Sequence, residues 1–515
     1  MARPFGRAAH WTCCLSVAAG VLATPAAAVT YEVTKTADTA DGSCSATDCS
    51  LREAVIAANA SAGADVVMVP LGTYELTRLT GTDPEQGDLD VLDSVTIRTP
   101  SRETDPAVIE TALSERLVEV GVGGITVTLR GLVLQGGGPE PTGGAIRVVD
   151  GGALTLERCE VRDSEASFGG GISFEVTAQG TLIDSIVSGN SATTRAGGID
   201  APTAGTLTLI RTTVEGNHSD GDGGGIFAPS TVTIESSTVS GNTADDVGGG
   251  IHIPSGTTTI VDSSIVGNEA ATTGGGVGVA GTLILRRSFV GANESVHGAG
   301  IFFFAVGSGL EVESSTFSLN TATGSGGGLY IDGPPGLVHI SSATVAINVA
   351  NSDGMGSGLG GGIYITGGAS PALPTLRNTI LANNFITVVS TPGDCQGSID
   401  SLGYNLIEST LACTIVGVTE GNVLGVDPVL GLGSNGGPTL NFMPMAGSPA
   451  LEAGDPTGCV DTAGVLLATD QRGFPRHVDD DADGVARCDI GAVERSLFSD
   501  DFETGDTSRW SGEVG

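Results

Sequence analysis

Two short motifs recur down the middle of the chain and set its pattern of apolar and polar positions. A Gly-Gly step closed by an aliphatic residue is followed by a polar step, in most units an Asn, and the pair returns about every 26 residues. The aliphatic residues are Ile146, Ile172, Ile199, Ile226, Ile251, Val277, Ile301, Leu329 and Ile363. The polar residues are Ser164, Asn190, Asn217, Asn242, Asn268, Asn293, Asn320, Asn348 and Asn384. A sustained period of this length indicates a stacked repeat architecture.

Two further columns are apolar in every unit. Eight residues before the polar step stand Leu156, Leu182, Leu209, Ile234, Ile260, Leu285, Val312, Ile340 and Leu376. Three residues before it stand Val161, Val187, Val214, Val239, Ile265, Val290, Phe317, Val345 and Leu381. Each unit has room for three short strands and three turns, so parallel stacking of the units predicts continuous sheets around one elongated apolar core.

The Gly pairs and the Asn residues fit this arrangement. Gly suits tight bends with unusual dihedral angles, and Asn suits turns with left-handed geometry. We expect equivalent Asn side chains to hydrogen bond from one unit to the next. A leucine-rich repeat would need Leu at several fixed offsets and a helical half-repeat, which the units lack. The predicted fold is therefore all-β, a right-handed parallel β-helix of the pectate-lyase-like kind with a short N-terminal capping helix.

The capping helix is predicted just after Cys49. Ser50 and Glu53 have the spacing of a capping box, and an apolar face follows. That face comprises Leu51, Ala54, Val55 and Ala58. Such a helix suits the open end of a repeat array. A catalytic role for Arg52 and Glu53 is the alternative to a helix cap with its solvated face, and the capping pattern favours the cap.

Charged residues beside the apolar columns are predicted to pair between units. Arg158, Asp184 and Arg211 occupy equivalent positions in successive units, as do Asp262 and Arg287. Opposite charges on neighbouring strands stabilise a sheet by roughly 0.2–1 kcal/mol per pair. We interpret these residues as structural.

The first residues have the form of a secretory signal. Arg3 and Arg7 precede an apolar core, Leu15 to Leu22, and an Ala26-Ala27-Ala28 cleavage site. A buried N-terminal segment is the less favoured alternative. No later stretch is long and apolar enough for a membrane helix. The mature chain is therefore expected to be exported, as a secreted or cell-surface bacterial protein without a transmembrane segment.

Charge and cysteine content refine this picture. The formal net charge is −37, which disfavours nucleic acid and anionic lipid as partners. Acidic polysaccharides would need a bridging divalent cation. Export makes disulfides plausible, and proximity along the chain suggests pairing Cys44 with Cys49, Cys395 with Cys413 and Cys459 with Cys488, leaving Cys159 alone in the array.

Several stretches resemble known families. The stretch 49–54 (CSLREA) resembles the CSLREA-type N-terminal domain of exported bacterial β-helix proteins. The segment 427–494, with NGGPT, GSPA, DQRG and CDIGA blocks, resembles the choice-of-anchor Q domain. The sequences GGAI at 143–146 and FSLN at 317–320 match the repeat motifs of chlamydial polymorphic outer membrane proteins, and 502–510 is similar to a terminal segment of other exported bacterial proteins. These resemblances imply a surface or extracellular β-helix protein and name no activity.

The predicted organisation follows from these stretches. We expect a signal peptide at 1–28, an N-terminal cap and first coils at 29–100, β-helix repeats at 101–425, a C-terminal cap at 426–495 and an acidic tail at 496–515.

Candidate chemistry lies at the residue after each Gly-Gly-aliphatic step, which is predicted to point outward. Asp200 and His252 lie two units apart, about 10 Å, which is long for acid–base coupling, so we read both as surface residues. Phe302, Tyr330 and Tyr364 fall on consecutive units and predict an aromatic stripe for a sugar or a protein partner. The alternative is that a loop at 351–360 covers them.

A metal site is the other candidate. Asp479, Asp481 and Asp483 precede Gly484, as in the opening of a calcium loop, and Asp489 is the nearest acidic residue to its usual end. A merely acidic turn is the alternative. Calcium is the one cofactor suggested.

The sequence thus favours a monomeric exported β-helix protein that adheres to, or binds, a cell-surface glycan or protein without catalysis. The alternative is a carbohydrate-active enzyme, a polysaccharide lyase or glycoside hydrolase, on the same scaffold. A lyase needs a base and a cation, and a hydrolase a tight carboxylate cluster. The motif set of polygalacturonases is not found in the sequence, and the arginine-rich stretch 472–476 lies outside the array.

Overall fold

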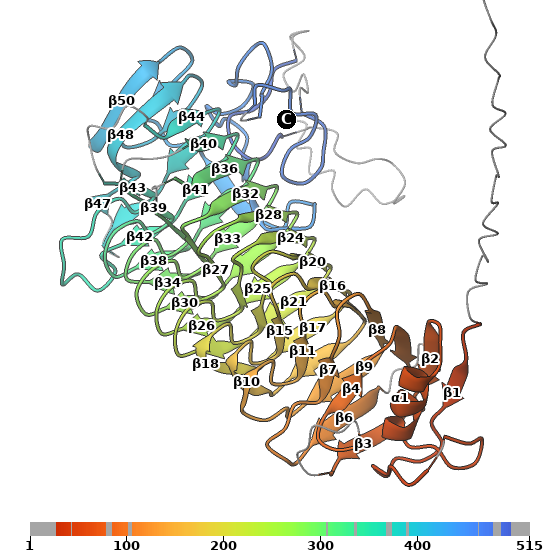
Figure 1. Cartoon of the computed structure of the whole chain (residues 1–515). Coiled ribbons are helices and arrows are strands. Elements are labelled where there is room, and N and C mark those ends of the chain that lie inside the picture. The colour runs from red at the N-terminus through yellow and green to blue at the C-terminus, as the bar shows by residue number, and fades with distance from the viewer. Residues whose placement is uncertain are drawn as a thin grey trace, which may run out of the picture.

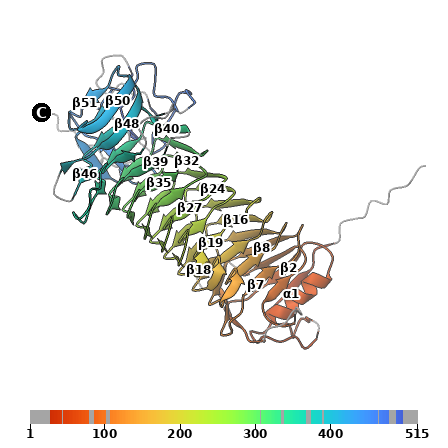
Figure 2. The same ribbon diagram turned by 60° about the vertical axis from the view of Figure 1, so that its left-hand side comes forward.

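The computed structural model describes residues 27–42, 44–78, 85–100, 106–304, 307–333, 337–366, 373–387, 391–461, 463–476 and 486–495. They form one elongated parallel β-helix, with β1 (Thr30–Glu32) and α1 (Leu51–Ala60) at one end and β48 (Cys395–Leu402) and β50 (Ala412–Val418) at the other (Figure 1). A view turned by 60° shows the strands stacked along the whole body (Figure 2). The predicted architecture, all-β with a short helix near the N-terminus, is confirmed.

One unit shows the plan of the others. Strands β23 (Ile226–Phe227) and β24 (Thr231–Glu235) belong to one sheet, β25 (Thr238–Ser240) to a second and β26 (Thr243–Ala244) to a third. Over the described residues these sheets hold 26, 14 and 11 strands. The prediction of three strands per unit is therefore one short, because the segment after the Gly-Gly step bends and contributes two strands to the same sheet.

The core consists of the predicted apolar columns stacked in register. Ile226 pairs with Ile251, Ile234 with Ile260, and Val239 with Ile265, so each aliphatic side chain packs on its equivalents above and below. Every residue of the two columns is buried. A solenoid built this way is stabilised by contacts between neighbouring units.

The Gly-Gly bend depends on left-handed backbone geometry. Gly223 has φ 66°, and a Cβ placed on it would lie 2.7 Å from the carbonyl oxygen of Ile226. In one unit Ala196 takes the same position with φ 60°. A side chain is strained in this conformation, which explains why the first residue of the bend is Gly in the other repeats.

The predicted asparagine ladder is present. Asn217 Nδ2 donates to Asn242 Oδ1 at 2.9 Å and to the carbonyl oxygen of Val187 at 3.0 Å, while its backbone amide donates to the same Oδ1 at 3.0 Å. The equivalent bonds link Asn190, Asn217, Asn242, Asn268, Asn293, Asn320, Asn348 and Asn384 in one buried chain. Each amide is satisfied by its neighbours, as buried polar groups require.

A second polar ladder, which the sequence analysis did not identify, runs five residues before the asparagines. Its hydroxyl oxygens accept hydrogen bonds from backbone amides of the preceding unit, at 3.0–3.1 Å. The hydroxyl residues in these bonds are Ser185, Ser237, Ser263, Ser288 and Ser315. The unpaired Cys159 occupies the same column, and burial raises the pKa of its thiol to about 11. The thiol is thus a structural group.

Two of the predicted charge pairs form between units, whereas no ion pair joins Arg158 to Asp184 among the described residues. Arg211 Nε lies 2.6 Å from Asp184 Oδ1, and Arg287 Nη2 lies 2.7 Å from Asp262 Oδ2. The hydrogen bond from Arg211 lowers the pKa of Asp184, and the charge of Arg158 adds to this. These residues occupy a corner with positive φ, so the pairs brace a tight turn.

The N-terminal helix begins as predicted. Ser50 Oγ accepts from the amide of Glu53, and Glu53 Oε2 accepts from the amide of Ser50 at 2.8 Å. The amides of Ser50 and Asp41, with the charge of Lys35, outweigh the effect of burial and lower the pKa of Glu53 to about 2. The predicted apolar face, Leu51, Ala54, Val55 and Ala58, is buried.

The expectation of a solvated face for Arg52 is wrong. Its side chain is 1% exposed, bonds to Asp38 at 2.7 Å and donates to the carbonyl oxygens of Gly87 and Asp88. Arg52 therefore fastens the helix to the loop before it and to the first coils, because a buried guanidinium needs a full set of acceptors.

The segment after the last coil lies against the side of the β-helix. We had expected this segment to cap the end of the β-helix instead. Gln471 Nε2 donates to the carbonyl oxygen of Ser288, Ala492 N to Thr344 Oγ1, and Gly491 N to the carbonyl oxygen of Asn378. Figure 1 shows this segment beside the upper part of the stack. It includes the hairpin of β52 (Leu430–Gly433) and β53 (Asn441–Pro444).

This lateral packing changes the burial of the second sheet. In β25 and β29 (Ser264–Val266) the middle residue is buried while its neighbours are partly exposed. In β33 (Phe289–Gly291), β37 (Thr316–Ser318), β41 (Thr344–Ala346) and β45 (Ile380–Ala382) all three residues are buried. The outer face of these four strands is therefore covered.

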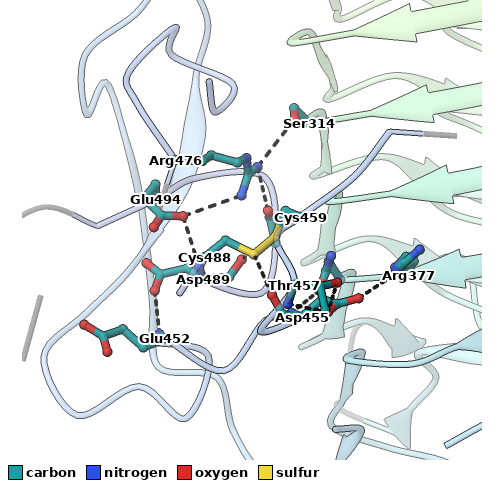
Figure 3. The surroundings of a disulfide bond; sticks show 12 residues. Ser314, Arg377, Glu452, Asp455, Thr457, Cys459, Arg476, Cys488, Asp489 and Glu494 are labelled. Atoms are coloured by element: carbon teal, nitrogen blue, oxygen red, sulfur yellow. Dashed lines mark hydrogen bonds and ion pairs between the residues drawn. A yellow bond between two sulfur atoms is a disulfide. The ribbon is translucent and has the colours of Figure 1, made fainter. Parts of the chain in front are cut away.

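The three predicted disulfides are present in the structure. Cys44 is joined to Cys49, Cys395 to Cys413 and Cys459 to Cys488, with Cα–Cα separations of 4.3, 5.4 and 6.0 Å. The last lies in the lateral segment, close to Asp455 and Arg476 (Figure 3).

Candidate functional site

A continuous column of side chains follows the Gly-Gly-aliphatic steps along the first sheet, and we call it the strip. Strand pairing places its members in direct register from one unit to the next. The strip comprises Asp90, Glu119, Arg147, Ser173, Asp200, Phe227, His252, Gly278, Phe302, Tyr330 and Tyr364. It is charged toward the N-terminus and aromatic toward the C-terminus.

These residues were expected to point outward into solvent, but several of them are covered. Asp200 is 5% exposed, His252 9% and Phe302 5%. The residues just before the Gly-Gly bend face the strip and cover it. In each unit the chain turns back at the bend, so these two positions meet across the corner.

Three contacts across this corner are well defined. Arg195 forms an ion pair with Asp200 at 3.2 Å, and Asp222 lies 3.2 Å from His252 Nδ1. The ring of His297 lies 5.4 Å from that of Tyr330. Arg195 precedes Asp200 by five residues across the same bend, whereas Asp222 and His297 come from the unit before that of their partners, and a list of outward positions does not reveal these contacts.

Asp200 and His252 each contact a different partner. Burial raises the pKa of Asp200, while the guanidinium of Arg195 opposes that effect. Burial also acts on Asp222, but the close imidazole of His252 outweighs it and lowers the pKa of Asp222. Each group is buried and has its own partner, so the expectation that both are surface residues is wrong.

Arg195 is also held by two aromatic rings. Its guanidinium carbon lies 4.6 Å from the ring centre of Phe168 and 4.7 Å from that of Phe227. The ring of Phe227 in turn meets His252 edge to face at 5.4 Å. In the middle of the strip the charged groups and the aromatic rings therefore contact one another in a single cluster.

The predicted aromatic stripe exists, but its rings stack on one another. Phe302 and Tyr330 have ring centres 4.7 Å apart with 18° between their planes, and Tyr330 and Tyr364 are 4.8 Å apart with 37°. Both faces of Tyr330 are thus occupied, and Phe304 packs against Phe302. Because both ring faces of Tyr330 are used within the stack, only its ring edges and hydroxyl group are left available.

The tyrosine hydroxyls are the polar groups of this region. Tyr330 and Tyr364 are half-buried, and no hydrogen bond from either hydroxyl is found among the described residues. Burial, with smaller contributions from Tyr364 and Asp332, raises the pKa of Tyr330 to about 12. Its phenol is therefore protonated at neutral pH and can donate a hydrogen bond.

The N-terminal part of the strip holds a charge cluster that the sequence analysis missed. Arg116 Nη1 lies 3.0 Å from Asp88 and 2.7 Å from Glu119, and Arg147 Nη1 lies 3.0 Å from Glu119. Burial and the charges of Asp88 and Glu119 raise the pKa of Asp90 to about 6. The alternation of apolar and acidic residues in β4 (Leu89–Val91) and β7 (Val118–Val120) could have indicated this cluster from the sequence.

Most of the predicted calcium site lies outside the described residues, namely Asp479, Asp481 and Asp483. Asp489 is described and is buried. Its carboxylate accepts from the amides of Glu452 and Arg495, both at 2.7 Å. The calcium site stays a prediction.

The arginine-rich stretch 472–476 has structural contacts. Arg476 donates to the carbonyl oxygens of Gly491 and Ala492 at 3.0 Å and reaches Ser314 Oγ of the β-helix at 3.4 Å (Figure 3). Arg472 bonds to Asp470 at 2.8 Å. These arginines hold the lateral segment together and attach it to the array.

Comparisons with known proteins agree with the architecture. Residues 122–284 match a family described as "Right handed beta helix region", which supports the predicted hand. Residues 314–332 match the repeat of Chlamydia polymorphic membrane proteins. The chain is thus a right-handed β-helix protein that carries a repeat of this kind.

The other comparisons add little. A crystal structure of pectate lyase Pel9A is similar at 12% identity, with 91% of this chain and 96% of that chain covered and a TM-score of 0.38. Comparison with curated protein sequences returns no match. Among the described residues no helix has the length and apolar character needed to cross a membrane.

Proposed function

We propose that this chain is an exported, surface-associated or extracellular binding protein, and that the β-helix presents the C-terminal part of the strip to a glycan or protein partner. The observation that carries the proposal is the pair of half-buried hydroxyls on Tyr330 and Tyr364, on adjacent units, without a protein acceptor among the described residues. The polymorphic membrane protein repeat at 314–332 supports a surface location, and it overlaps the stripe.

The stacked geometry decides how a partner would be recognised. A sugar ring laid on an aromatic face needs that face free, and Tyr330 has none. Recognition would then rest on hydrogen bonds to the two phenols and on contact with ring edges. A partner with acceptor groups about 4.8 Å apart, the spacing of neighbouring strands, fits this arrangement.

The test removes the hydroxyls and keeps the stack. Binding to glycan arrays and to cell surfaces is measured for the wild type and for Tyr330→Phe/Tyr364→Phe. Two lost hydrogen bonds should weaken binding by roughly 10- to 100-fold. Tyr404→Phe, which lies outside the strip, is the matched control and should leave binding unchanged. Equal binding by the double variant and the wild type contradicts the proposal.

A carbohydrate-active enzyme is the second candidate, and one observation favours it. Asp90 and Glu119 are paired in register on adjacent strands, and Asp90 holds a proton to about pH 6. A carboxyl with a raised pKa beside a second carboxyl group is the arrangement used by glycoside hydrolases. Polysaccharide hydrolysis that disappears in both Asp90→Asn and Glu119→Gln would establish this function. Activity that survives both changes would exclude this cluster as its source.

The terminal segments complete the proposal. We propose that 29–100 closes one end of the scaffold. We propose that 426–495, which resembles the choice-of-anchor Q domain, contributes to retention at the surface. Its hydrogen bonds to the side of the array support a fixed position on the scaffold. A truncation that removes 426–515 should release the protein from the cell surface into the medium.

A further inference from the structure

Three metal-ligating side chains gather on the third sheet, outside the strip. His218 lies in β22 (His218–Ser219), Asp220 follows it, and Asp245 follows β26 one unit later. One ligand atom from each of the three lies within 4.8 Å of the other two. We infer that His218, Asp220 and Asp245 bind a late first-row divalent cation, for which Zn²⁺ is the best match.

The imidazole of His218 is already oriented for this role. Strand pairing sets His218 opposite Thr243, and Nδ1 lies 2.8 Å from Thr243 Oγ1. Metal-binding histidines commonly use one ring nitrogen for an orienting hydrogen bond and the other for the metal. Here that leaves Nε2, which points at the carboxylate of Asp220, 3.0 Å away.

The three side chains fit one metal ion if Asp245 moves inward. Ligand atoms at about 2.0–2.1 Å from a tetrahedral zinc lie about 3.3–3.4 Å from one another. The pair of Nε2 and Asp220 Oδ1 is close to that value at 3.0 Å. Asp245 is exposed, and within the described part of the chain its carboxylate takes no hydrogen bond, so it can move inward.

The ligand types select the kind of cation. Calcium and magnesium prefer oxygen ligands, whereas an imidazole with two carboxylates suits zinc and its neighbours. Three protein ligands leave one position to water or to an outside group. The net charge of −37 also concentrates cations at the surface.

The test is calorimetric titration of the untagged, full-length protein with ZnCl₂. Wild type should bind zinc at micromolar concentration, and His218→Ala and Asp245→Asn should each weaken that binding at least 10-fold. His339→Ala is the matched control. The His339 Nδ1 forms the same kind of bond, to Thr375 Oγ1 at 2.7 Å, and no ion pair from its ring to a carboxylate occurs among the described residues. This variant should bind zinc as the wild type does.

The inference has clear ways to fail. It is overturned if zinc produces no binding heat, or if His218→Ala binds as tightly as the wild type. It is also overturned if millimolar calcium displaces the zinc, because a site that calcium fills does not depend on the imidazole. Circular dichroism and melting curves establish that the variants keep the fold, as expected for partly exposed side chains.

Discussion

Asp394 terminates the asparagine ladder by accepting two hydrogen bonds from Asn384, one from Nδ2 at 2.9 Å and one from the backbone amide at 3.1 Å. Burial raises the pKa of the Asp394 carboxyl to about 6, although the bonds from Asn384 and Ser409 oppose it. A carboxylate thus occupies the position where a further unit would place an amide, because the regular array ends here.

This relationship predicts a pH dependence of stability. The pKa of Asp394 is higher in the folded protein than its ordinary 3.8, so the folded state binds the proton more tightly. The free energy of unfolding should therefore rise as pH falls from 7 through about 6, by about 2.5 kcal/mol at pH 4 and by at most about 3 kcal/mol at lower pH. Urea unfolding of Asp394→Asn should lack this contribution. A variant with the same pH profile as the wild type would contradict the assignment, and Asp90→Asn measures the separate contribution of Asp90.

A single ladder asparagine should be costly to remove. Asn268→Ala removes the acceptor of the Asn242 backbone amide, one of the two acceptors of Asn242 Nδ2 and the side-chain donor to the carbonyl oxygen of Val239, while Nδ2 keeps its bond to Val214. Buried unsatisfied groups cost about 1–3 kcal/mol each, so we expect a loss of about 3–5 kcal/mol in the free energy of unfolding. Ser264→Ala, on the outer face of the same unit, should change it by less than about 0.5 kcal/mol. Similar losses in both variants would show that the asparagine ladder contributes little to the free energy of unfolding.

The flat guanidinium of Arg195 should matter beyond its charge. Arg195→Lys keeps a positive charge near Asp200 and loses the stacking between Phe168 and Phe227. We expect a loss of about 1–2 kcal/mol in urea unfolding. Arg211→Lys, in an exposed pair with Asp184, is the control and should have a clearly smaller effect on the urea midpoint. Equal effects would mean that the stacking contributes nothing.

The aromatic stack should support the fold independently of any partner. Tyr330→Ala removes the ring between Phe302 and Tyr364, and we expect a loss of about 2–4 kcal/mol in the free energy of unfolding. Tyr330→Phe should be nearly neutral in the same thermal and urea experiments. A comparable loss in Tyr330→Phe would mean that the hydroxyl is bonded within the protein, which would weaken the proposed binding role.

The disulfide of the lateral segment should stabilise it more than the short N-terminal one. Cys459 and Cys488 are 29 residues apart, and cross-linking a loop of this length stabilises the folded state by about 3–4 kcal/mol. Cys44 and Cys49 are 5 residues apart, and their cross-link stabilises it by about 2 kcal/mol. Replacing Cys459 and Cys488 by Ser should therefore expose the segment to limited proteolysis while the array stays intact. Protection equal to that of the wild type would show that contacts with the array suffice to hold it.

Much of the fold was predictable because each unit repeats its own local pattern. The position of Ile234 relative to Asn242 recurs in every unit, so one period assigned the inward residues, the bend and the ladder. The capping box of Ser50 and Glu53 was also readable, since both residues lie within one helical turn. The hydroxyl column at Ser263 repeats just as regularly, and attention to small polar residues would have found it.

The candidate site was only partly predictable. The sequence placed Phe302, Tyr330 and Tyr364 in one column but could not show whether ring faces or edges remain available, because that depends on side-chain packing between units. Asp200 was read as a surface carboxylate, yet it pairs with Arg195, five residues earlier, across the bend.

The sequence by itself determined the period, the inward columns, the asparagine ladder and the capping helix of this protein, since these follow from spacing within and between adjacent units. The tertiary structure decided which outward groups are covered. Arg52 is buried by loops that pack around it, and Ser288 is bonded by Gln471, 183 residues later. No local pattern specifies which distant segment will pack on a given face, because that choice depends on the free energy of the whole folded chain.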